Sequence, residues 1–563
     1  MCAMGSLRSR SVVSKSSVNT CLGQLRHSAA KESTLMTIPS STTGRKSAAT
    51  NNESPRARRR QSQACSTPYL WLLLLVAFFS GTPLLLASST LVTYPVPAGV
   101  PTSHVFEVKL RTPGSAWQVI ECYAPEVNTR AHTRTSMTYF DFSGTVEVAV
   151  TLTQGALNTA RIRPRSFQVE PAIAGNTLTF TLTRPRNLSI EVNGDTFHNL
   201  QLFAGAIDAP PPPQGPDVIY FGPGLHSPGP KLALKSGQTL YLAGGAVLQT
   251  SIVCDHVHDV QILGRGILYQ AEDGIGVAFS DRVRIHGVIV MNPSHYAVLA
   301  GNTTNLSIEG LKSFSSQGWG DGIDIFSSKH VLVDDVFMRN SDDTIAIYGH
   351  RWNFAGDVDD VTVQNSVLWP DVAHPIIVGT HGNPSQPETL EHLTFKNIDI
   401  LQQDEPQIDY QGCIALNASD SNLIQHVRIE DVRIEDITRG QIVNLRVMFN
   451  RKYATAPGRG VQDVYLKNLA YTGTHANMSV ISGYDDTHAV HDITFENLSI
   501  NGTVISDHMP GKPPFYKTGD MANILISDHA DRILFLTSEE AHQKTLSPAA
   551  PKQRQDSHLQ IGK

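Results

Sequence analysis

Hydrophobic positions recur along the chain in one short template between about residues 258 and 498. Each copy has two polar residues, an apolar-x-apolar pair, a polar or glycine pair and a further apolar residue. The copies are spaced by 23 to 37 residues, and their first apolar positions are Val260, Val283, Leu306, Val331, Val361, Leu393, Val427, Val464 and Ile493. A repeat of this period, made of strands and turns without amphipathic helices, predicts a solenoid.

A right-handed parallel β-helix is the solenoid that this template favours. In such a fold each coil stacks its strand on the preceding coil and buries the apolar-x-apolar pairs. Leucine-rich repeats need a fixed leucine and asparagine frame that is absent here, and propeller blades are longer. Because the coils lengthen toward the middle and end of the chain, we expect their loops to build the walls of a binding groove.

The region before the repeats follows a different pattern. Apolar and polar residues alternate in short runs over residues 90–209, as in Val146–Val150 and Leu178–Leu182. This alternation predicts a small antiparallel β-sandwich, which we expect to cap the first coil. A proline-rich run over residues 210–216 predicts a stiff linker. The β-helix is then expected over residues 217–530, followed by a polar C-terminal tail over residues 531–563.

Residues 1–89 form a basic extension rich in Ser and Thr that ends in an apolar segment. The arginines between Arg56 and Arg60 precede the apolar run Leu70–Phe79, and small residues follow at Ser88 and Ser89. This order is typical of a secretory signal peptide, which predicts a secreted or periplasmic protein with no membrane attachment after cleavage. A membrane anchor is the alternative interpretation, since the apolar stretch is close to the lower length limit for spanning.

Charge and cysteine content narrow the function classes of the remaining body. The extension carries 11 of the 45 Lys and Arg residues and 2 of the 51 Asp and Glu residues, so the body has a formal charge of −15. Such a body is a poor partner for nucleic acid, whose affinity comes largely from phosphate neutralisation. The body's cysteines Cys122, Cys254 and Cys413 are too few and too widely spaced for a disulfide framework or a zinc site, and either one bridge or free thiols fit them. No phosphate loop, nucleophile elbow or linear metal-binding histidine motif occurs, so we expect no cofactor and no metal.

Two neighbouring coils carry a cluster of aspartates. When Ile323 is aligned with Ile345, Asp321 falls over Asp343, with Asp342 beside it. Stacked strands lie about 4.7–4.9 Å apart, so the three carboxylates would crowd together and the pKa of at least one would rise. A protonated acid beside an ionised base is what glycosidic hydrolysis requires. Ordinary polar coil corners and a calcium site are the alternative interpretations.

At these residues the chain resembles glycoside hydrolase family 28, the polygalacturonase family, with kinship to the dextranases of family 49. Gly320–Gly322 is similar to the family's first carboxylate segment, and Asp342 and Asp343 follow at the family's spacing. The segment around His374 is similar to the family's histidine segment, although its flanking glycines are replaced. The resemblance implies Asp342 as the general acid, Asp321 and Asp343 as the groups that hold the water, an assisting His374, and inversion at the anomeric carbon.

The chain departs from the family at the basic pair that grips a galacturonate carboxylate. Cys413–Asn417 occupies the coil where an Arg-x-Lys pair is expected. Arg446 or Lys452, one coil further on, could replace the pair, and ordinary surface charge is the alternative for both.

Further residues are candidates for substrate contact. Asp324 and His350 are the ones we assign to substrate binding beside Arg446 and Lys452. For His381 two interpretations stay open: a functional residue near the aspartates, or a turn histidine bonded to the backbone. Ring-bearing side chains that could stack on sugar rings are Trp319, His350, Trp352 and Tyr484. Acidic loop residues that could line the groove are Asp404, Glu405, Asp485 and Asp486.

These patterns predict a secreted, monomeric glycoside hydrolase acting on a pectin-like or related α-linked polysaccharide by inverting acid/base catalysis. Three alternatives stay open at this point. They are a dextranase-like α-glucan hydrolase, a polysaccharide lyase, and a carbohydrate-binding solenoid without catalysis. The absence of a clustered Arg or Lys beside the aspartates argues against a lyase.

Overall fold

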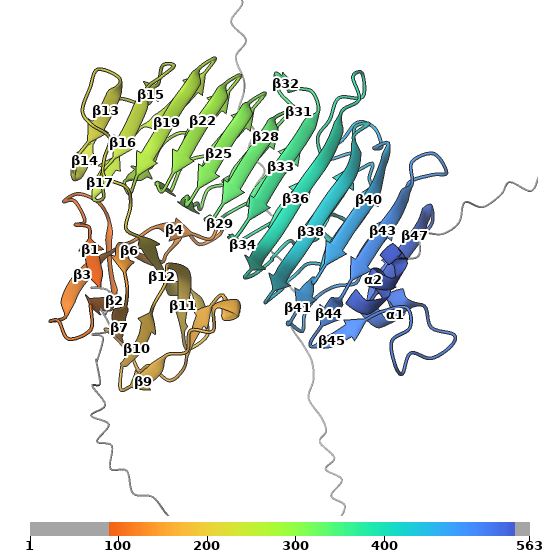
Figure 1. The fold of residues 1–563 in the computed structure, drawn as a ribbon, viewed down its shortest axis with the longest axis horizontal. Coiled ribbons are helices and arrows are strands. Elements are labelled where there is room, and N and C mark those ends of the chain that lie inside the picture. Colours follow the sequence, from red (N-terminus) through yellow and green to blue (C-terminus); the bar gives the residue numbers. More distant parts are fainter. Residues whose placement is uncertain (1–88, 547–563) are drawn as a thin grey trace, which may run out of the picture. The chain divides into compact units, whose positions relative to one another are not determined.

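The structure is a computed structural model that describes residues 89–546. The predicted basic extension and signal segment, apart from Ser89, and the end of the predicted tail lie outside the described residues. Within this range the chain folds as a right-handed parallel β-helix preceded by a smaller β-domain (Figure 1), which confirms the predicted fold class. The coils of the β-helix are built from two parallel sheets.

The larger sheet of the β-helix has 22 strands within the described residues. Its strands are β13 (Val218–Phe221), β14 (Gly224–His226), β16 (Thr239–Leu242), β17 (Ala246–Leu248), β19 (His258–Gly264), β20 (Ile267–Tyr269), β22 (Asp281–His286), β23 (Ile289–Met291), β25 (Thr304–Glu309), β26 (Lys312–Phe314), β28 (Lys329–Asp334), β29 (Phe337–Asn340), β33 (Val358–Gln364), β34 (Val367–Pro370), β36 (Thr389–Ile400), β38 (Leu423–Ile434), β40 (Gly460–Lys467), β41 (Ala470–Tyr471), β43 (Val490–Glu496), β44 (Leu498–Ile500), β45 (Thr503–Ile505) and β47 (Ala530–Leu536).

The second sheet contributes one strand to each coil and has 11 strands in the described part of the chain. They are β15 (Lys231–Ala233), β18 (Ser251–Asp255), β21 (Ile275–Ala278), β24 (Val298–Gly301), β27 (Ile323–Phe326), β30 (Ile345–Tyr348), β35 (Ile376–Val378), β37 (Ile414–Ala418), β39 (Val443–Val447), β42 (Ser479–Ser482) and β46 (Ile524–Ile526). A short hairpin of β31 (His350–Arg351) and β32 (Phe354–Ala355) follows β30.

The predicted register of the coils is confirmed. The nine apolar positions from Val260 to Ile493 pair directly with one another on successive coils, and the column continues to Ile533. These side chains are buried in one continuous core together with the apolar residues of the second sheet. A one-residue slip would turn every apolar side chain outward, which is why the alternating pattern specifies the register so strongly.

The residue before each of these apolar positions adopts a left-handed conformation. The set comprises Asp259, Arg282, Asn305, His330, Asp360, His392, His426, Asp463, Asp492 and Arg532. Asn, Asp and His tolerate positive φ better than most side chains. The polar pair that opens each copy of the template therefore supplies a bend and places one polar side chain per coil in a column on the surface.

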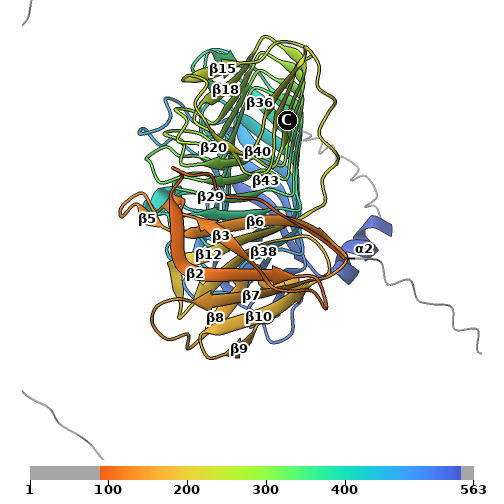
Figure 2. The ribbon, with the colours of Figure 1, turned by 90° about the vertical axis from the view of Figure 1, so that its left-hand side faces the viewer.

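The N-terminal domain consists of one connected sheet of ten strands that encloses a separate core. Its strands are β1 (Thr90–Thr93), β2 (Thr102–Arg111), β3 (Gln118–Tyr123), β6 (Ser136–Ser143), β7 (Val146–Leu152), β8 (Ala160–Arg163), β9 (Ala172–Ala174), β10 (Thr177–Leu182), β11 (Arg186–Val192) and β12 (Asp195–Ala206). Figure 2 shows β2, β7 and β10 side by side in this sheet. All its pairings are antiparallel except that of β12 with β6, which is parallel. A two-stranded ribbon of β4 (Glu126–Val127) and β5 (Thr133–Arg134) projects from it.

Both polar and aromatic contacts join this domain to the β-helix. The guanidinium of Arg163 is fully buried and donates to Glu435 (2.8 Å), which directly follows β38, and to Glu191 (2.9 Å) of its own domain. Tyr123, Tyr139 and Phe203 lie in one buried cluster with residues of the β-helix, among them Phe314 and Trp369.

The C-terminal end differs from the expected polar tail. β47 continues to Leu536 and the helix α2 (Ser538–Leu546) follows, after a short helix α1 (Thr518–Ala522) earlier in the chain. β47 pairs in parallel with β43 of the preceding coil, and Phe535 stacks on Phe495 with ring centroids 4.9 Å apart. The remaining short helices are η1 (Arg165–Phe167) and η2 (Ile408–Tyr410).

Two further observations concern residues 89–546. None of the helices in this range has the length and apolar character needed to cross a bilayer. Cys122, Cys254 and Cys413 are buried free thiols, so of the two interpretations of these cysteines the structure supports free thiols.

Candidate active site

The strands β27 and β30 bring the predicted aspartates together. Ile323 pairs with Ile345, and the amide of Gly322 donates to the carbonyl of Asp343 at 2.8 Å. Asp321 therefore lies beside Asp343 on successive coils, as the alignment predicted. A Cβ on Gly322 would meet the carbonyl oxygen of Thr344 at 2.3 Å, so only glycine allows this close approach.

Serine and asparagine side chains fix the loop that carries Asp321. The Ser315 hydroxyl donates to the carbonyl of Gly320 at 2.5 Å, and the Ser341 hydroxyl donates to the carbonyl of Gln317 at 2.5 Å. The Asn340 amide donates to the carbonyl of Asp321 at 3.3 Å. These bonds link the loop before β27 to the loop before β30, so the two carboxylate-bearing corners are held as one unit.

The aspartates lie in a cleft of about 350 Å³ on the side of the second sheet. Its lining comes from loops of several coils, as the lengthening repeats predicted. The lining residues are Tyr296, Trp319, Asp321, Asp324, Asp342, Asp343, Tyr348, Arg351, Val372, Ala373, His381, Glu405, Gln407, Tyr410, Lys452 and Tyr453. Such a concave site with convergent carboxylates and aromatic walls is suited to a sugar chain.

His374 lies behind the aspartates and not in the cleft. Its side chain is 0% exposed, and its Nε2 donates to the carbonyl of Tyr410 at 2.6 Å. Its Nδ1 and its backbone amide both contact Oδ1 of Asp343, at 2.7 and 2.9 Å. Burial lowers the pKa of His374, but the charge of Asp343 and the hydrogen bond to it outweigh burial and raise the pKa above its ordinary value. The ring thus acts on the site through Asp343.

Asp343 is held as a hydrogen-bond acceptor. While Oδ1 receives the two N–H groups of His374, Oδ2 receives the hydroxyl of Tyr348 at 3.3 Å. A carboxylate with both oxygens occupied in this way has a fixed orientation in the cleft wall.

Asp342 differs from its neighbour in accessibility. It is half-buried, and its Oδ1 accepts the backbone amide of Asp343 at 3.1 Å. Burial and the nearby charge of Asp343 raise the pKa of Asp342 to about 7, although the Asp343 amide and the charge of His374 act in the opposite direction. A carboxyl group with this pKa is protonated in a large fraction of molecules near neutral pH.

Asp321 and Asp324 complete the group of four. Burial, followed by the charges of Asp324, Asp342 and Asp343, raises the pKa of Asp321 well above its ordinary value. Burial, followed by the charges of Asp343 and Asp342, also raises the pKa of Asp324, which is only 1% exposed. One oxygen of each carboxyl, Oδ1, is buried and has no hydrogen-bond partner among the described residues. Both residues line the cleft, and each keeps one buried oxygen without a partner in the described part of the chain.

The remaining predicted substrate-binding residues divide into two groups. Lys452 lines the cleft, where its Nζ donates to the Gln407 side chain at 2.6 Å. His350 does not line the cleft and instead faces Glu388, with Nδ1 to Oε1 at 3.9 Å. Arg446 does not line it either, and its Nη1 donates to the carbonyl of Asp409 at 3.2 Å. The placement of these two residues does not support a direct contact with substrate.

In the coil where the family's basic pair is expected, the residues that point away from the core are uncharged. On β37, Ile414 and Leu416 point into the core, so Ala415 and Asn417 take the alternate positions. Both are buried. The positive charge in the cleft comes from Arg351 and Lys452 instead.

Several lining residues were not assigned from the sequence. Arg351, the neighbour of His350, lines the cleft and pairs with Phe354 in the hairpin of β31 and β32. Tyr410 lies across from His374 with ring centroids 4.6 Å apart. Glu405, in contrast, is one of the acidic loop residues predicted from the sequence as candidates, and it lines the cleft, whereas its neighbour Asp404 pairs with Arg439. The repeat template does not mark Arg351 or Tyr410, because both lie in segments that connect one coil to the next. Of the proposed aromatic walls, Trp319 lines the cleft, and Trp352 and Tyr484 do not.

The calcium interpretation of the aspartates is not supported by the spacing of their oxygens. Within residues 89–546, the group of three or more His, Cys, Asp or Glu ligand atoms lying within 4.8 Å of one another is Glu391, His392 and His426, which is elsewhere. The cleft carboxylates of the described residues form no such group.

Comparison with known proteins relates this arrangement to a family. The model of glycosyl hydrolases family 28 matches residues 269–511, which include all four aspartates and His374. A dextranase of Arthrobacter sp. (strain CB-8) is 22% identical over 363 residues, which are 54% of this chain and 52% of that protein. A putative galacturan 1,4-alpha-galacturonidase A of Aspergillus niger is 20% identical over 260 residues, which are 39% of this chain and 57% of that protein. The chain thus spans about half the length of the curated relatives it matches.

Among solved structures, Dex49A from Penicillium minioluteum has the same fold. It superposes with a TM-score of 0.53 at 14% identity and covers 78% of this chain and 96% of its own. That share is larger than the β-helix alone, so the similarity extends into the N-terminal domain. Residues 269–511 are therefore similar in sequence to the glycosyl hydrolases of family 28, and the chain is similar to one dextranase in sequence and to another in fold.

Proposed function

We propose that the protein is an extracellular glycoside hydrolase that cleaves an α-linked polysaccharide by inverting acid/base catalysis. The observation that carries this proposal is the contrast between two adjacent carboxyls in one cleft. Asp342 is half-buried and has a pKa of about 7, whereas Asp343 is buried and held as an acceptor by His374 and Tyr348. Acid and base roles are separated in this way in glycosidases.

The reaction can be written for these residues. Asp342 donates its proton to the glycosidic oxygen as the bond from that oxygen to the anomeric carbon breaks. A water held by Asp321 and Asp343 attacks the anomeric carbon from the opposite face, and its proton passes to one of these carboxylates. The new C–O bond has the opposite anomeric configuration, and proton exchange with solvent restores the starting state.

Two substrate classes fit the cleft, and a specific observation supports each. Uncharged Ala415 and Asn417 in place of a basic pair favour a neutral α-glucan, in keeping with the similarity to a dextranase. Arg351 and Lys452 in the cleft favour a pectin-like chain with carboxylates. If the second class is right, Lys452→Gln and Arg351→Gln lower activity on galacturonan more than on dextran. If the first is right, the two variants change activity on dextran little.

A panel of galacturonan, rhamnogalacturonan and dextran tests the activity. The full-length protein should release reducing ends from at least one of them, and Asp342→Asn should lower the rate by about 10²–10⁴-fold with unchanged thermal stability at acidic pH. NMR of the first product should show inversion. Unsaturated products would indicate a lyase instead, and glycan binding that survives Asp342→Asn without any reducing ends would indicate a binding solenoid.

The extracellular location rests on the apolar segment Leu70–Phe79, which lies outside the described residues. N-terminal sequencing of protein recovered from the medium should find a start near Ser89. Retention of the uncut chain in the membrane fraction would support the anchor interpretation.

A further inference from the structure

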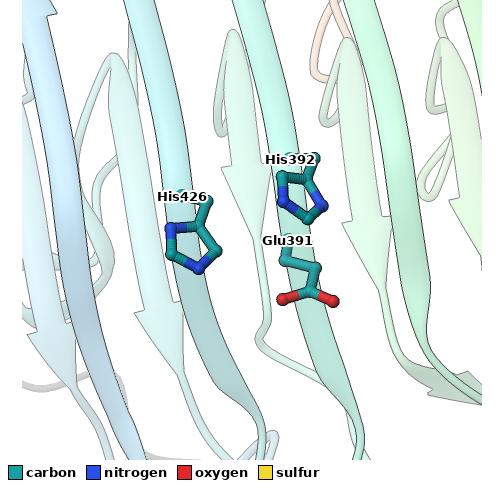
Figure 3. A group of neighbouring side chains, drawn as sticks. All are labelled: Glu391, His392 and His426. Carbon is teal, nitrogen blue, oxygen red and sulfur yellow. The ribbon is translucent and has the colours of Figure 1, made fainter.

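Two histidines from successive coils lie side by side on the larger sheet, away from the cleft. His392 belongs to β36 and His426 to β38, and both occupy the left-handed position that opens a coil. Their neighbours Glu391 and Gln425 pair directly in the sheet. Figure 3 shows both rings and the Glu391 carboxylate on the same surface.

The geometry of the two rings is regular. Their centroids are 5.2 Å apart and their planes are inclined by 14°. One ligand atom from each of Glu391, His392 and His426 lies within 4.8 Å of the other two. Atoms at this spacing can all reach a central ion at about 2.0–2.2 Å after small side-chain adjustments.

A carboxylate orients each ring. Nδ1 of His392 donates to Asp359 of the preceding coil at 2.8 Å, and Nδ1 of His426 donates to Asp463 of the following coil at 2.7 Å. The two acids lie on opposite sides of the pair, so Nε2 is the nitrogen that each ring leaves for a ligand. Histidines that bind metals usually have this arrangement, in which a carboxylate fixes the tautomer and raises the basicity of the other nitrogen.

Glu391 is oriented as well. Its Oε2 accepts the Gln425 amide at 2.6 Å, and Gln425 in turn accepts the Gln462 amide at 2.8 Å. The carboxylate is thus directed along the sheet surface by a ladder of uncharged side chains, and Oε1 stays available.

We propose that Glu391, His392 and His426 form a surface site for a divalent transition-metal ion of the zinc type. Two imidazole nitrogens and one carboxylate oxygen are the ligand set of borderline ions, and not of calcium or magnesium. The three protein ligands leave a fourth position for water. The ion would join two coils that hydrogen bonds and packing alone connect, and it would stabilise the folded state because the unfolded chain lacks the site. The proposal is independent of the function proposed for the cleft.

Zinc titration of the full-length protein by calorimetry tests the site, with His330→Gln as a matched control. His330 has the same left-handed position, a similar exposure and a bond from Nδ1 to Asp360 at 2.8 Å, but its neighbour in the column is Asp360 and not an imidazole. Wild type and His330→Gln should bind their most tightly held Zn²⁺ ion with the same affinity. His392→Gln and His426→Gln should each lower the affinity for that ion more than tenfold, and the double variant should no longer bind it.

A spectroscopic signature separates ligation from loose association with other histidines. Co²⁺ bound by the wild type should give a visible d–d absorption band that Zn²⁺ displaces and that the double variant lacks. Because both side chains are exposed, the metal-free variants should keep the wild-type melting temperature. The proposal is overturned if the double variant binds its most tightly held Zn²⁺ ion as strongly as the wild type does. It is also overturned if the wild type shows no saturable binding.

Discussion

The backbone amide and the ring of His374 both donate to one oxygen of Asp343, at 2.9 and 2.7 Å. His374 lies just before β35, which stacks directly on β30, the strand that follows Asp343, so two coils jointly determine where this carboxylate points. The ring is out of reach of any substrate because it is fully buried. His374 is therefore a positioning residue for Asp343.

Replacement of His374 by alanine should lower kcat by about 10²-fold and change KM little, because a misplaced base affects the transition state more than substrate binding. Steady-state kinetics on the substrate identified by the panel measures both constants. His350→Ala is the control, since His350 belongs to the neighbouring coil and does not line the cleft. A loss confined to KM would contradict the positioning role.

Asp342 should govern the alkaline limb of the pH–rate profile. Its pKa of about 7 means that the protonated acid is depleted as pH rises through that value. We expect kcat/KM to fall about tenfold per pH unit at alkaline pH, and the free-enzyme profile reports this group. A rate that stays constant from about pH 6 to about pH 9 would exclude Asp342 as the acid.

Asp324→Asn should stabilise the protein. The folded-state pKa of Asp324 is raised above that of the unfolded chain, so the native state holds the proton more tightly and the wild type loses stability as pH rises from about 4. Asparagine stays neutral, and the gain in melting temperature should therefore grow with pH above about 4.

Thermal melts between about pH 4 and about pH 8 measure this gain. Asp409→Asn, at an exposed position of η2, is the control for the same substitution outside the buried cluster of carboxyl groups. Equal melting temperatures of Asp324→Asn and wild type at neutral pH would show that the cleft tolerates the charge. Activity should fall in Asp324→Asn if the group contacts substrate, which is the expected trade between stability and function.

Arg163→Met should destabilise the protein by about 3–5 kcal/mol, because it leaves the buried carboxylates of Glu191 and Glu435 without their shared partner. Denaturant unfolding measures the change. Arg161→Met is the matched control: Arg161 also pairs with Glu191 but is 40% exposed, and its loss should change stability by about 1 kcal/mol or less. Similar effects of both variants would contradict the importance of burial.

Trp319→Ala should raise KM about tenfold, or about 1.4 kcal/mol of binding, with kcat nearly unchanged. Trp319 is 73% exposed at the cleft and offers a flat apolar face to a sugar ring. Trp117→Ala, in the N-terminal domain beside Arg111, should leave both constants unchanged. A loss of kcat alone would place Trp319 outside substrate binding.

The sequence by itself determined the coil register and the carboxylate group. Val260 to Ile493 pair as the template predicted, and the same register places Asp321 beside Asp343. The physical reason is that strands alternate with period two and each coil must bury the same face, so a local pattern suffices.

Only the tertiary structure decided which loop residues reach the cleft and which side chains meet across coils. Arg351 lines the cleft, whereas His350 and Arg446 do not. The sequence could not distinguish them, because the connections between coils have no periodic pattern and their paths depend on packing against other coils. The tertiary structure also brought His392 beside His426 across 34 residues of sequence, which no linear metal-binding motif describes. Contacts of this kind follow from the length of each coil, and that length is fixed by the folded chain as a whole.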